Sequence, residues 1–191
     1  HEYFTEVPEV TDRAFVKAVW EGVARICLPF YRHAYTVGPG LAKIFEERYG
    51  LPFGVVRNVP LKEDFPPQVL PEGRKVLFYM GALNEGRGIE TALEAMQHLN
   101  TTELWLAGEG DLSAPLRALS TRLGVEEKVR FLGYTSPEDL RTLVARAWLG
   151  LNLLENRGLS YYYSLANKFF ANVQAGVPVL TMDFPEYRAL N

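Results

Sequence analysis

A glycine-rich loop between a strand-like and a helix-like segment carries the clearest signal for binding chemistry. An apolar run, Val76 to Met80, precedes the loop Gly81–Gly88, and the residues after the loop have helical spacing. Such a turn places backbone N–H groups and the positive end of a helix dipole at one point, which suits a phosphate or pyrophosphate. Arg87 adds a full charge and a planar set of donors. An ordinary β–α turn would need the same glycines, and the loop is neither GxGxxG nor a P-loop.

A second polar cluster lies in the segment 153–180. Ser164 is predicted to cap a helix, with Asn167 and Lys168 in its first turn. A lysine at a helix N-terminus is unfavourable for the dipole, so Lys168 should have a negative partner. That partner is either Glu155 or a phosphate of a ligand, and the sequence leaves both open.

Two shorter loops follow strand-like runs. Gly108 lies in AGEGD, residues 107–111, where it permits either a close backbone approach or a simple tight turn. Tyr134 follows Gly133, at a place where its ring would stack on a nucleobase. Ser136 then begins a helix with Pro137.

These loops need a scaffold, and the chain from Lys75 onward alternates strand and helix patterns. The expected strands are 75–80, 103–107, 128–132, 149–153 and 177–181. The expected helices are 88–98, 113–123, 137–147 and 165–175, with a short one from about Pro185. This alternation predicts an α/β fold with a doubly wound parallel sheet, which binds ligands at the carboxyl ends of its strands.

The first 59 residues predict a partial α/β domain. An amphipathic helix should begin near Thr11 or Asp12 and end at Pro29, and a strand (34–38), a helix ending at Gly50 and a strand (53–59) follow. Prolines and charges across 60–74 indicate a linker. We therefore expect residues 1–59 to be the trailing part of one domain and residues 75–191 to form a second domain, with residues 60–74 as the linker between them. We expect the chain to be cut at both ends and inactive alone.

Composition narrows the classes of function. The net charge is −3, and no cluster of basic residues favours a nucleic-acid partner. The single cysteine, Cys27, rules out an internal disulfide and fits the cytoplasm. The chain shows no apolar run long enough to span a membrane, and from its polar, acidic first residues we expect no signal peptide. Its three histidines, His1, His33 and His98, are far apart, and we expect no metal site.

Taken in order, the segments VVRNVP, YMGALNEGRGIETALEAM, LWLAGEGDL, VRFLGYTSPEDL and SLANKFFANVQAGVPVL resemble the donor-binding half of GT-B glycosyltransferases. The similarity is to the retaining, glycogen-synthase-like family 4. The opening HEYFTEVPE resembles the end of the N-terminal domain in bacterial members. The resemblance covers essentially the whole chain.

That resemblance implies a Rossmann-like GT-B half that binds a UDP- or GDP-linked sugar and transfers the sugar with retained configuration, without a metal or other cofactor. The acceptor would be a glycan or a lipid-linked molecule, as in polysaccharide biosynthesis. By position, Arg87 replaces the lysine that neutralises the diphosphate, and Gly81 opens the loop beneath it. Tyr134 would face the base, and His1 matches a catalytic-site histidine that faces the donor sugar. The other residues implied in donor binding are Ala82, Gly88, Gly108, Glu155, Ser164, Asn167 and Lys168.

Two departures from the family pattern concern charged positions. The family commonly has an arginine where this chain has Ala82, and an acidic pair where it has Tyr163 and Ala171. The second acid normally accepts hydrogen bonds from the ribose, and losing one such bond costs roughly 1.5–3 kcal/mol. Glu155 or Asn172 would have to compensate.

Three alternatives remain open on the sequence. A GT-B-type nucleotide-sugar epimerase would need more acids and histidines than the chain shows. A non-catalytic module that binds a sugar nucleotide or a partner fits Ala82 and Ala171. Helix 12–28 would attach to the inner face of a membrane through its apolar side, or pack inside a domain.

Overall fold

The computed structural model describes residues 3–7, 10, 13–62 and 64–190. The chain divides into two compact units. The first comprises the described residues of His1–Val59, Glu155–Leu165 and Asp183–Asn191, and the second those of Pro60–Leu154 and Ala166–Met182.

The second unit contains a parallel sheet in the order β5-β4-β3-β6-β7. Its strands are β3 (Lys75–Met80), β4 (Thr102–Ala107), β5 (Val129–Gly133), β6 (Leu149–Asn152) and β7 (Val179–Thr181). The predicted doubly wound α/β sheet is therefore confirmed. The strand order reverses between β3 and β6, and this switch point is where such sheets place their ligands.

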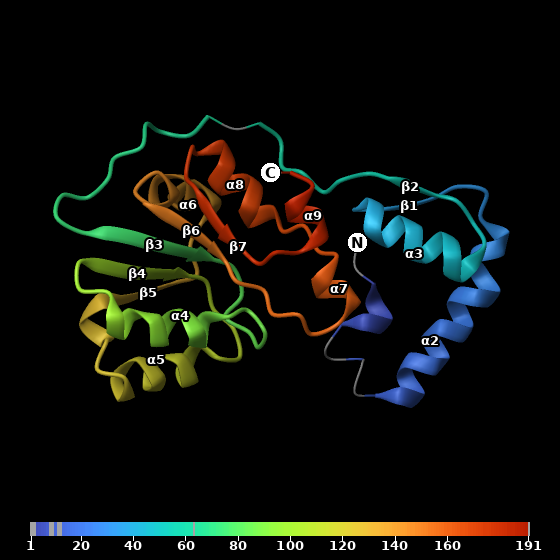
Figure 1. Ribbon diagram of the computed structural model, residues 1–191, viewed down its shortest axis with the longest axis horizontal. Coiled ribbons are helices and arrows are strands. Elements are labelled where there is room, and N and C mark those ends of the chain that lie inside the picture. The colour runs from blue at the N-terminus through green and yellow to red at the C-terminus, as the bar shows by residue number, and fades with distance from the viewer. Residues whose placement is uncertain (1–2, 8–9, 11–12, 63, 191) are drawn as a thin grey trace. The chain divides into compact units, whose positions relative to one another are not determined.

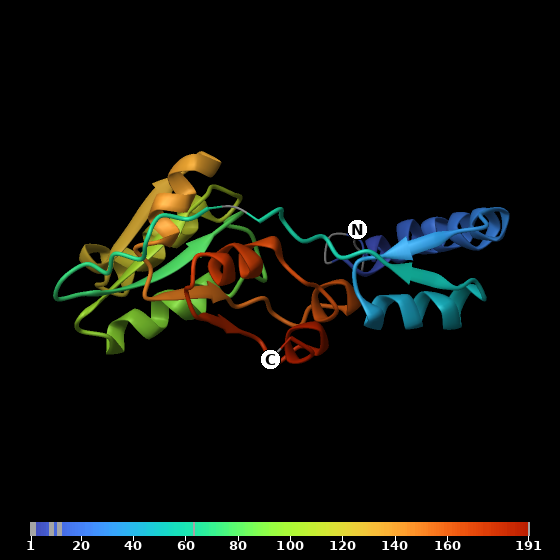
Figure 2. The same ribbon diagram turned by 90° about the horizontal axis from the view of Figure 1, so that it is seen from above.

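Helices cover both faces of this sheet (Figures 1 and 2). They are α4 (Ile89–Ala95), which continues into the 3-10 turn η3 (Met96–His98), α5 (Ser113–Arg122), α6 (Pro137–Val144) and α8 (Asn167–Gln174), with a further 3-10 turn, η4 (Glu126–Lys128). Successive residues of β3 enter opposite cores: Tyr79 joins the core beneath α4 and α5, whereas Phe78 joins the core beneath α6 and α8. This alternation is the period of two that a strand imposes on its side chains.

Two of the predicted helix caps have different outcomes. Ser136 caps α6, because its hydroxyl accepts a hydrogen bond from the Asp139 amide at 3.1 Å. Ser164 does not cap α8: the helix begins at Asn167 and the cap position is Ala166, which has no side-chain acceptor. The prediction of Ser164 as a cap was therefore wrong, because the helix starts two residues later than its pattern indicated.

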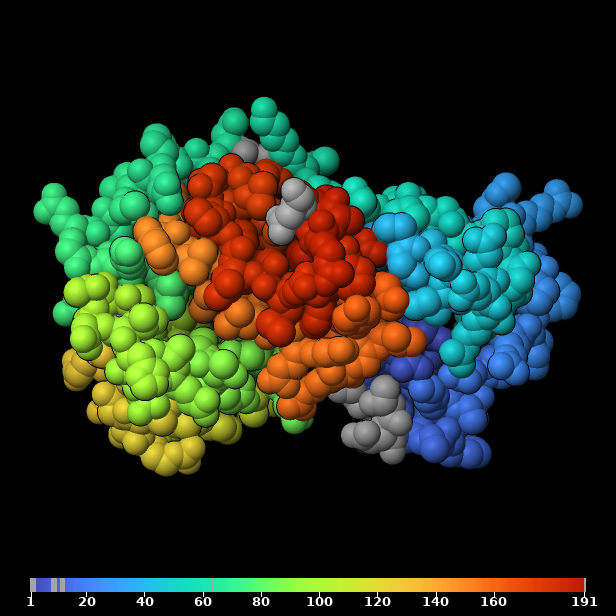
Figure 3. Space-filling view, viewed as in Figure 1, coloured from blue at the N-terminus to red at the C-terminus, as the bar shows by residue number. Residues whose placement is uncertain are grey.

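The proline-rich segment 60–74 belongs to the second unit and forms neither helix nor strand over its described residues. The Val69 amide donates to the Ala145 carbonyl at 2.9 Å, and the Gln68 side chain donates to the Ala147 carbonyl at 2.9 Å. Phe65 packs against the core beneath α6 and α8. Figure 3 shows the segment, in green, along the surface of this unit.

The first unit is smaller and contains a two-stranded parallel sheet of β1 (Ala34–Thr36) and β2 (Phe53–Val55). Its helical segments are η1 (Phe4–Glu6), α2 (Ala14–Cys27), η2 (Leu28–Phe30), α3 (Pro39–Tyr49), α7 (Leu159–Tyr162) and α9 (Pro185–Arg188). Gly50 ends α3 in the left-handed conformation, as predicted. Strand β2 is shorter than the expected 53–59, and the expected caps of α2, Thr11 and Asp12, lie outside the described residues.

Two late segments join this first unit, whereas the sequence assigned all of 75–191 to a second domain. The reason lies at the start of α3. The Glu186 carboxylate accepts a hydrogen bond from the Gly40 amide at 2.9 Å, and a Cβ at Gly40 would overlap the Tyr163 ring. Helix α7, which the sequence treated as loop, supplies that ring from its C-terminal end.

Helix α2 exposes an unusual amount of apolar surface. None of its residues is buried, and Phe15 and Ile26 are 82% and 70% exposed. None of the helices among the described residues combines the length and the hydropathy that crossing a bilayer requires.

Candidate functional site

Three loops at the carboxyl edge of the second unit's sheet are joined by backbone hydrogen bonds. The Gly81 amide after β3 donates to the Ala107 carbonyl at the end of β4 (2.9 Å). The Leu83 amide donates to the Glu109 carbonyl (3.1 Å), and the Gly108 amide donates to the carbonyl of Gly133, the last residue of β5 (2.8 Å). The loops after β3, β4 and β5, which the sequence singled out, therefore form one continuous surface.

Several positions in these loops require glycine, among them Gly108 and Gly88. Gly108 has φ 141°, and a Cβ there would overlap the Gly81 carbonyl. Gly88, before α4, has φ 67°, and a Cβ there would overlap the Leu153 carbonyl after β6. Close backbone approach therefore brings the loop after β3 against both of its neighbours, on the two sides of the switch point.

Two cations, Lys168 and Arg87, lie near each other at this edge, and Lys168 lies beside Gly81. The Lys168 ammonium, from the first turn of α8, lies 4.1 Å from the centre of the Tyr79 ring. A Cβ at Gly81 would lie only 3.4 Å from its Nζ. The Arg87 guanidinium is close enough to repel the same ammonium. The structure thus joins the predicted residues Gly81, Arg87 and Lys168, which are separated by up to 87 positions in the chain.

The electrostatics of this cluster show in Lys168. Burial disfavours its charged form, and the charge of Arg87 adds repulsion, so that the pKa of Lys168 falls to about 7. A dianionic group bound between Lys168 and Arg87 would replace their mutual repulsion with attraction to the ligand and would raise the pKa of Lys168 again. The cluster is therefore arranged to accept negative charge.

Tyr79 is a member of this site that the sequence analysis treated only as a strand residue. It is 2% exposed, its hydroxyl donates to the Ala82 carbonyl at 2.8 Å, and its ring faces Lys168. The sequence did contain a sign of this role, a tyrosine within the apolar run Val76–Met80. A buried phenol needs a hydrogen-bond partner, which points to a polar contact at this place. Ala82 itself contributes that carbonyl to the loop.

Two further predicted residues lie at the same edge of the sheet. Tyr134 follows β5 directly and is 86% exposed, which leaves its ring available for stacking. Asn167 is the first residue of α8 and is exposed.

The remaining predicted residues are not brought to this cluster by the described contacts. Glu155 and Ser164 belong to the first unit, where the Glu155 carboxylate accepts a hydrogen bond from Arg157 Nε at 2.6 Å. His1 lies outside the described residues.

The sequence offered Asn172 as a substitute for the missing ribose acceptor, and this was wrong. Asn172 is 1% exposed, and its amide donates to the Lys168 carbonyl at 2.7 Å. A Cβ at Gly150 would overlap the Asn172 side chain, which therefore fills the space between α8 and β6. Ala171 packs against the core beneath α6 and α8.

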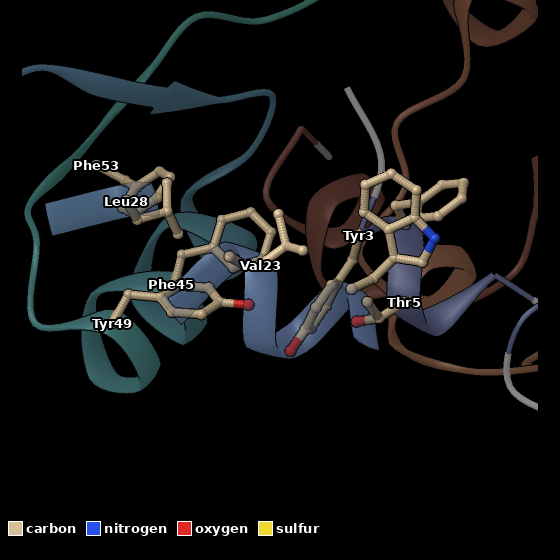
Figure 4. Close-up of a pocket in the computed structure, with 10 residues that line it drawn as sticks. Tyr3, Thr5, Val23, Leu28, Phe45, Tyr49 and Phe53 are labelled. Atoms are coloured by element: carbon tan, nitrogen blue, oxygen red, sulfur yellow. The ribbon is translucent and has the colours of Figure 1, made fainter. Parts of the chain in front are cut away.

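The first unit contains an apolar cavity of about 270 Å³ (Figure 4). The ten side chains that line it include Tyr3, Val23, Phe45, Tyr49 and Phe53, and all ten are uncharged. This lining offers nothing to neutralise a phosphate. No group of three or more potential metal-binding side chains occurs among the residues that the structure describes.

Comparison with known proteins links this site to a family. The family model described as "Glycosyl transferases group 1" matches residues 61–159, just over half of the chain. A lipopolysaccharide core biosynthesis glycosyltransferase, LpsE of Rhizobium meliloti (strain 1021), is 37% identical over 75 residues, which are 39% of this chain and 22% of that protein. The uncharacterized glycosyltransferase MJ1607 of Methanocaldococcus jannaschii is 33% identical over 79 residues, 40% of this chain and 20% of that protein.

Solved structures share the fold. Anabaena Alr3699/HepE, in complex with UDP and glucose, superposes with a TM-score of 0.72 at 17% identity, over 91% of this chain and 50% of that chain. The apo form of WaaB, a lipopolysaccharide outer core galactosyltransferase, superposes with a TM-score of 0.64 at 17% identity, over 83% and 46%. The chain thus spans about a fifth of these curated relatives and half or less of these solved chains.

Proposed function

Because the chain belongs to the glycosyl transferases group 1 family, we propose that it binds a nucleoside-diphosphate sugar at the loops after β3, β4 and β5. We further propose that the glycosyl group passes to an acceptor with retained configuration, as in the family-4 group, and without a metal ion. The observation that carries this proposal is that Lys168 lies beside Gly81 at the switch point of the sheet, with the charge of Arg87 acting on its ammonium.

The chemistry of this reaction matches the charges at the site. When the bond to the sugar breaks, the departing diphosphate gains negative charge. Arg87 supplies a permanent cation with several donors, and Lys168 supplies a second cation once the diphosphate favours its protonated form. Two side-chain cations would thus provide the neutralisation that divalent cations provide in metal-dependent transferases.

The nature of the substrates is supported by relatives of this chain. HepE was solved with UDP and glucose, which favours a UDP-linked hexose as donor here, with a GDP-linked sugar as the alternative. The name of LpsE favours a glycan acceptor, free or linked to lipid. We place the exposed Tyr134 ring against the base of the nucleotide. A cytoplasmic location, with the apolar face of α2 at the membrane, is the corresponding proposal for the protein's place in the cell.

One observation favours a second function, a non-catalytic module that binds a sugar nucleotide. The positions of the family's usual acidic pair hold Tyr163 and Ala171, and Tyr163 packs against Gly40. Ala82 stands where an arginine is usual. Hydrolysis of the donor by a version extended at both ends would distinguish the enzyme from the binding module.

Calorimetric titration of the chain with UDP and GDP, with ADP as control, tests the proposed site. We expect one of UDP and GDP to bind selectively, which would identify the base. Absence of binding to this chain and to a chain extended at both ends would contradict the proposal.

A further inference from the structure

A second group of cations lies at the opposite, amino-terminal edge of the same sheet. A cavity of about 280 Å³ is lined there by Arg74, Arg130, Arg146, Glu103 and Trp105, among others. The length of β3 separates this edge from Gly81 by roughly 20 Å. Neither the family resemblance nor the proposed donor site uses this cavity.

Glu103 holds two of the three guanidinium groups in place. It is 7% exposed, and its carboxylate pairs with Arg130 Nε at 2.9 Å and with Arg74 at 3.1 Å. A guanidinium has five N–H donors, so most of the donors on Arg74 and Arg130 are not used by Glu103. Because both side chains are already fixed, a ligand that bound them would lose little conformational entropy.

Arg146 adds a cation that Glu103 does not hold. Its guanidinium lies 5.0 Å from the centre of the Trp105 ring, and the Arg130 guanidinium lies 5.3 Å from the same centre. Among the described residues, the indole ring is the partner that the structure gives to Arg146. Three guanidinium groups therefore line the cavity with two carboxylates, those of Glu103 and Glu72, which leaves an excess of positive charge.

We infer that the cavity of Arg74, Arg130 and Arg146 is a second anion site, which binds a phosphate group either free or carried by a small molecule. Planar guanidinium groups suit the paired oxygens of a phosphate. An adjoining cavity of about 390 Å³ shares Pro71, Gly73 and Arg74 with the first, and it gives space for the remainder of a phosphorylated compound. Its side wall is the Trp148 ring, with the Lys75 ammonium 4.2 Å from the ring centre.

The test uses the full chain carrying Arg87→Ala, which removes one of the two cations at the donor edge. Inorganic phosphate and glycerol 3-phosphate are titrated by calorimetry, with glycerol as the uncharged control. We expect both anions to bind and glycerol not to bind. Tighter binding of glycerol 3-phosphate would identify a phosphorylated compound as the ligand, and equal binding would identify free phosphate. Absence of phosphate binding would overturn the inference.

Arg146→Gln tests whether phosphate binds in this cavity. Arg146 takes no part in the hydrogen bonds of Glu103, so replacing Arg146 should leave the fold intact. We expect it to weaken phosphate binding about tenfold. The matched control is Arg122→Gln, at the exposed end of α5, which should bind phosphate as the parent does. Equal phosphate affinity in the Arg146→Gln variant and the parent would also overturn the inference.

Discussion

The two edges of the second unit's sheet both gather cationic side chains, but they balance the charge differently. At the amino edge, the buried Glu103 carboxylate pairs with Arg74 and Arg130. At the carboxyl edge, the charge that acts on Lys168 is the like charge of Arg87. Among the described residues, the Glu103 carboxylate is the counter-ion at the amino edge, whereas the Lys168 ammonium lies over the Tyr79 ring at the carboxyl edge.

The pKa values of the two edges move accordingly. Burial alone would raise the pKa of Glu103, but hydrogen bonds from Trp105, Arg130 and Arg74, with the charge of Arg130, lower it below its usual value. Lys168 has burial and repulsion acting together, and its pKa falls to about 7. The Glu103 carboxylate thus ties the amino-edge cluster into the fold, whereas the lowered pKa of the buried Lys168 marks the carboxyl edge as a candidate binding site.

The largest expected effect tests the backbone geometry of the carboxyl edge. Gly108→Ala should lower the free energy of unfolding by on the order of 3 kcal/mol, because its Cβ would overlap the Gly81 carbonyl at a φ of 141°. Gly124→Ala is the matched control, since Gly124 also has a positive φ but has no atom within 4 Å of the added Cβ. It should cost only about 1–2 kcal/mol. Urea denaturation measures both, and equal losses would mean that the close approach to Gly81 is not important.

The next effect tests the cations of the same edge. Arg87→Ala should weaken the binding of UDP or GDP by about 2–3 kcal/mol, because it removes a charged partner of the diphosphate. Binding of uridine or guanosine should change much less. Titrations of the nucleoside and its diphosphate measure the difference, and equal losses for both would exclude a phosphate role for Arg87.

The sequence could predict most of this edge because backbone geometry leaves a local pattern. Gly81, Gly88 and Gly108 each follow or precede an element with clear periodicity, so the strands, the helices and the loops between them were all located. The contact of Lys168 with the Tyr79 ring joins residues 89 positions apart and has no local pattern. Asn172 shows the same limit, because only packing decides whether a helical amide faces a ligand or the strand beneath it.

The division of the chain was less predictable than the fold. Residues 155–165 and 183–190 come shortly after β6 and β7, and their sequence gave no sign that they would pack with the first unit. One long-range contact that anchors the second of these segments runs from the Gly40 amide to the Glu186 carboxylate. Such a contact between residues 146 positions apart depends on tertiary structure alone.

The third effect tests the amino edge. Glu103→Gln should lower the free energy of unfolding by about 2 kcal/mol, because two guanidinium groups would lose their shared carboxylate. It should leave nucleotide binding unchanged. The lowered pKa of Glu103 also predicts that its contribution is present above the carboxyl's unfolded pKa and is lost as the pH falls through its folded value.

Exposed Glu127→Gln is the control for this change and should stay within about 0.5 kcal/mol of the parent. Thermal denaturation at pH 7 and pH 4 measures both variants. A Glu103 variant as stable as the Glu127 variant would show that the amino edge does not depend on its carboxylate.

The fourth effect concerns the position of the missing ribose acceptor. Ala171→Glu should tighten nucleotide binding by about 1.5 kcal/mol if the ribose lies beside position 171 and the new carboxylate turns away from the core that Ala171 contacts, because a carboxylate accepts hydrogen bonds from the ribose hydroxyls. Ala171→Gln has nearly the same size without the charge and should gain less. Calorimetry of both variants provides the comparison, and no gain in either would place the ribose elsewhere.

The smallest effect separates the two edges by their response to pH. In the free chain, Lys168 loses its proton near pH 7, and a bound diphosphate would raise its pKa again. Binding above pH 7 then takes up a proton, so the affinity for UDP or GDP should fall by up to about tenfold per pH unit. The free energy of unfolding of the unligated chain should instead rise with pH over this range. The reason is that, between pH 7 and the ordinary lysine pKa, the unfolded chain binds more protons than the folded chain. Titrations in two buffers of different ionisation enthalpy count the proton taken up, and Lys168→Met should abolish it. Affinity that is independent of pH between 7 and 9 in the parent would mean that Lys168 does not contact the ligand.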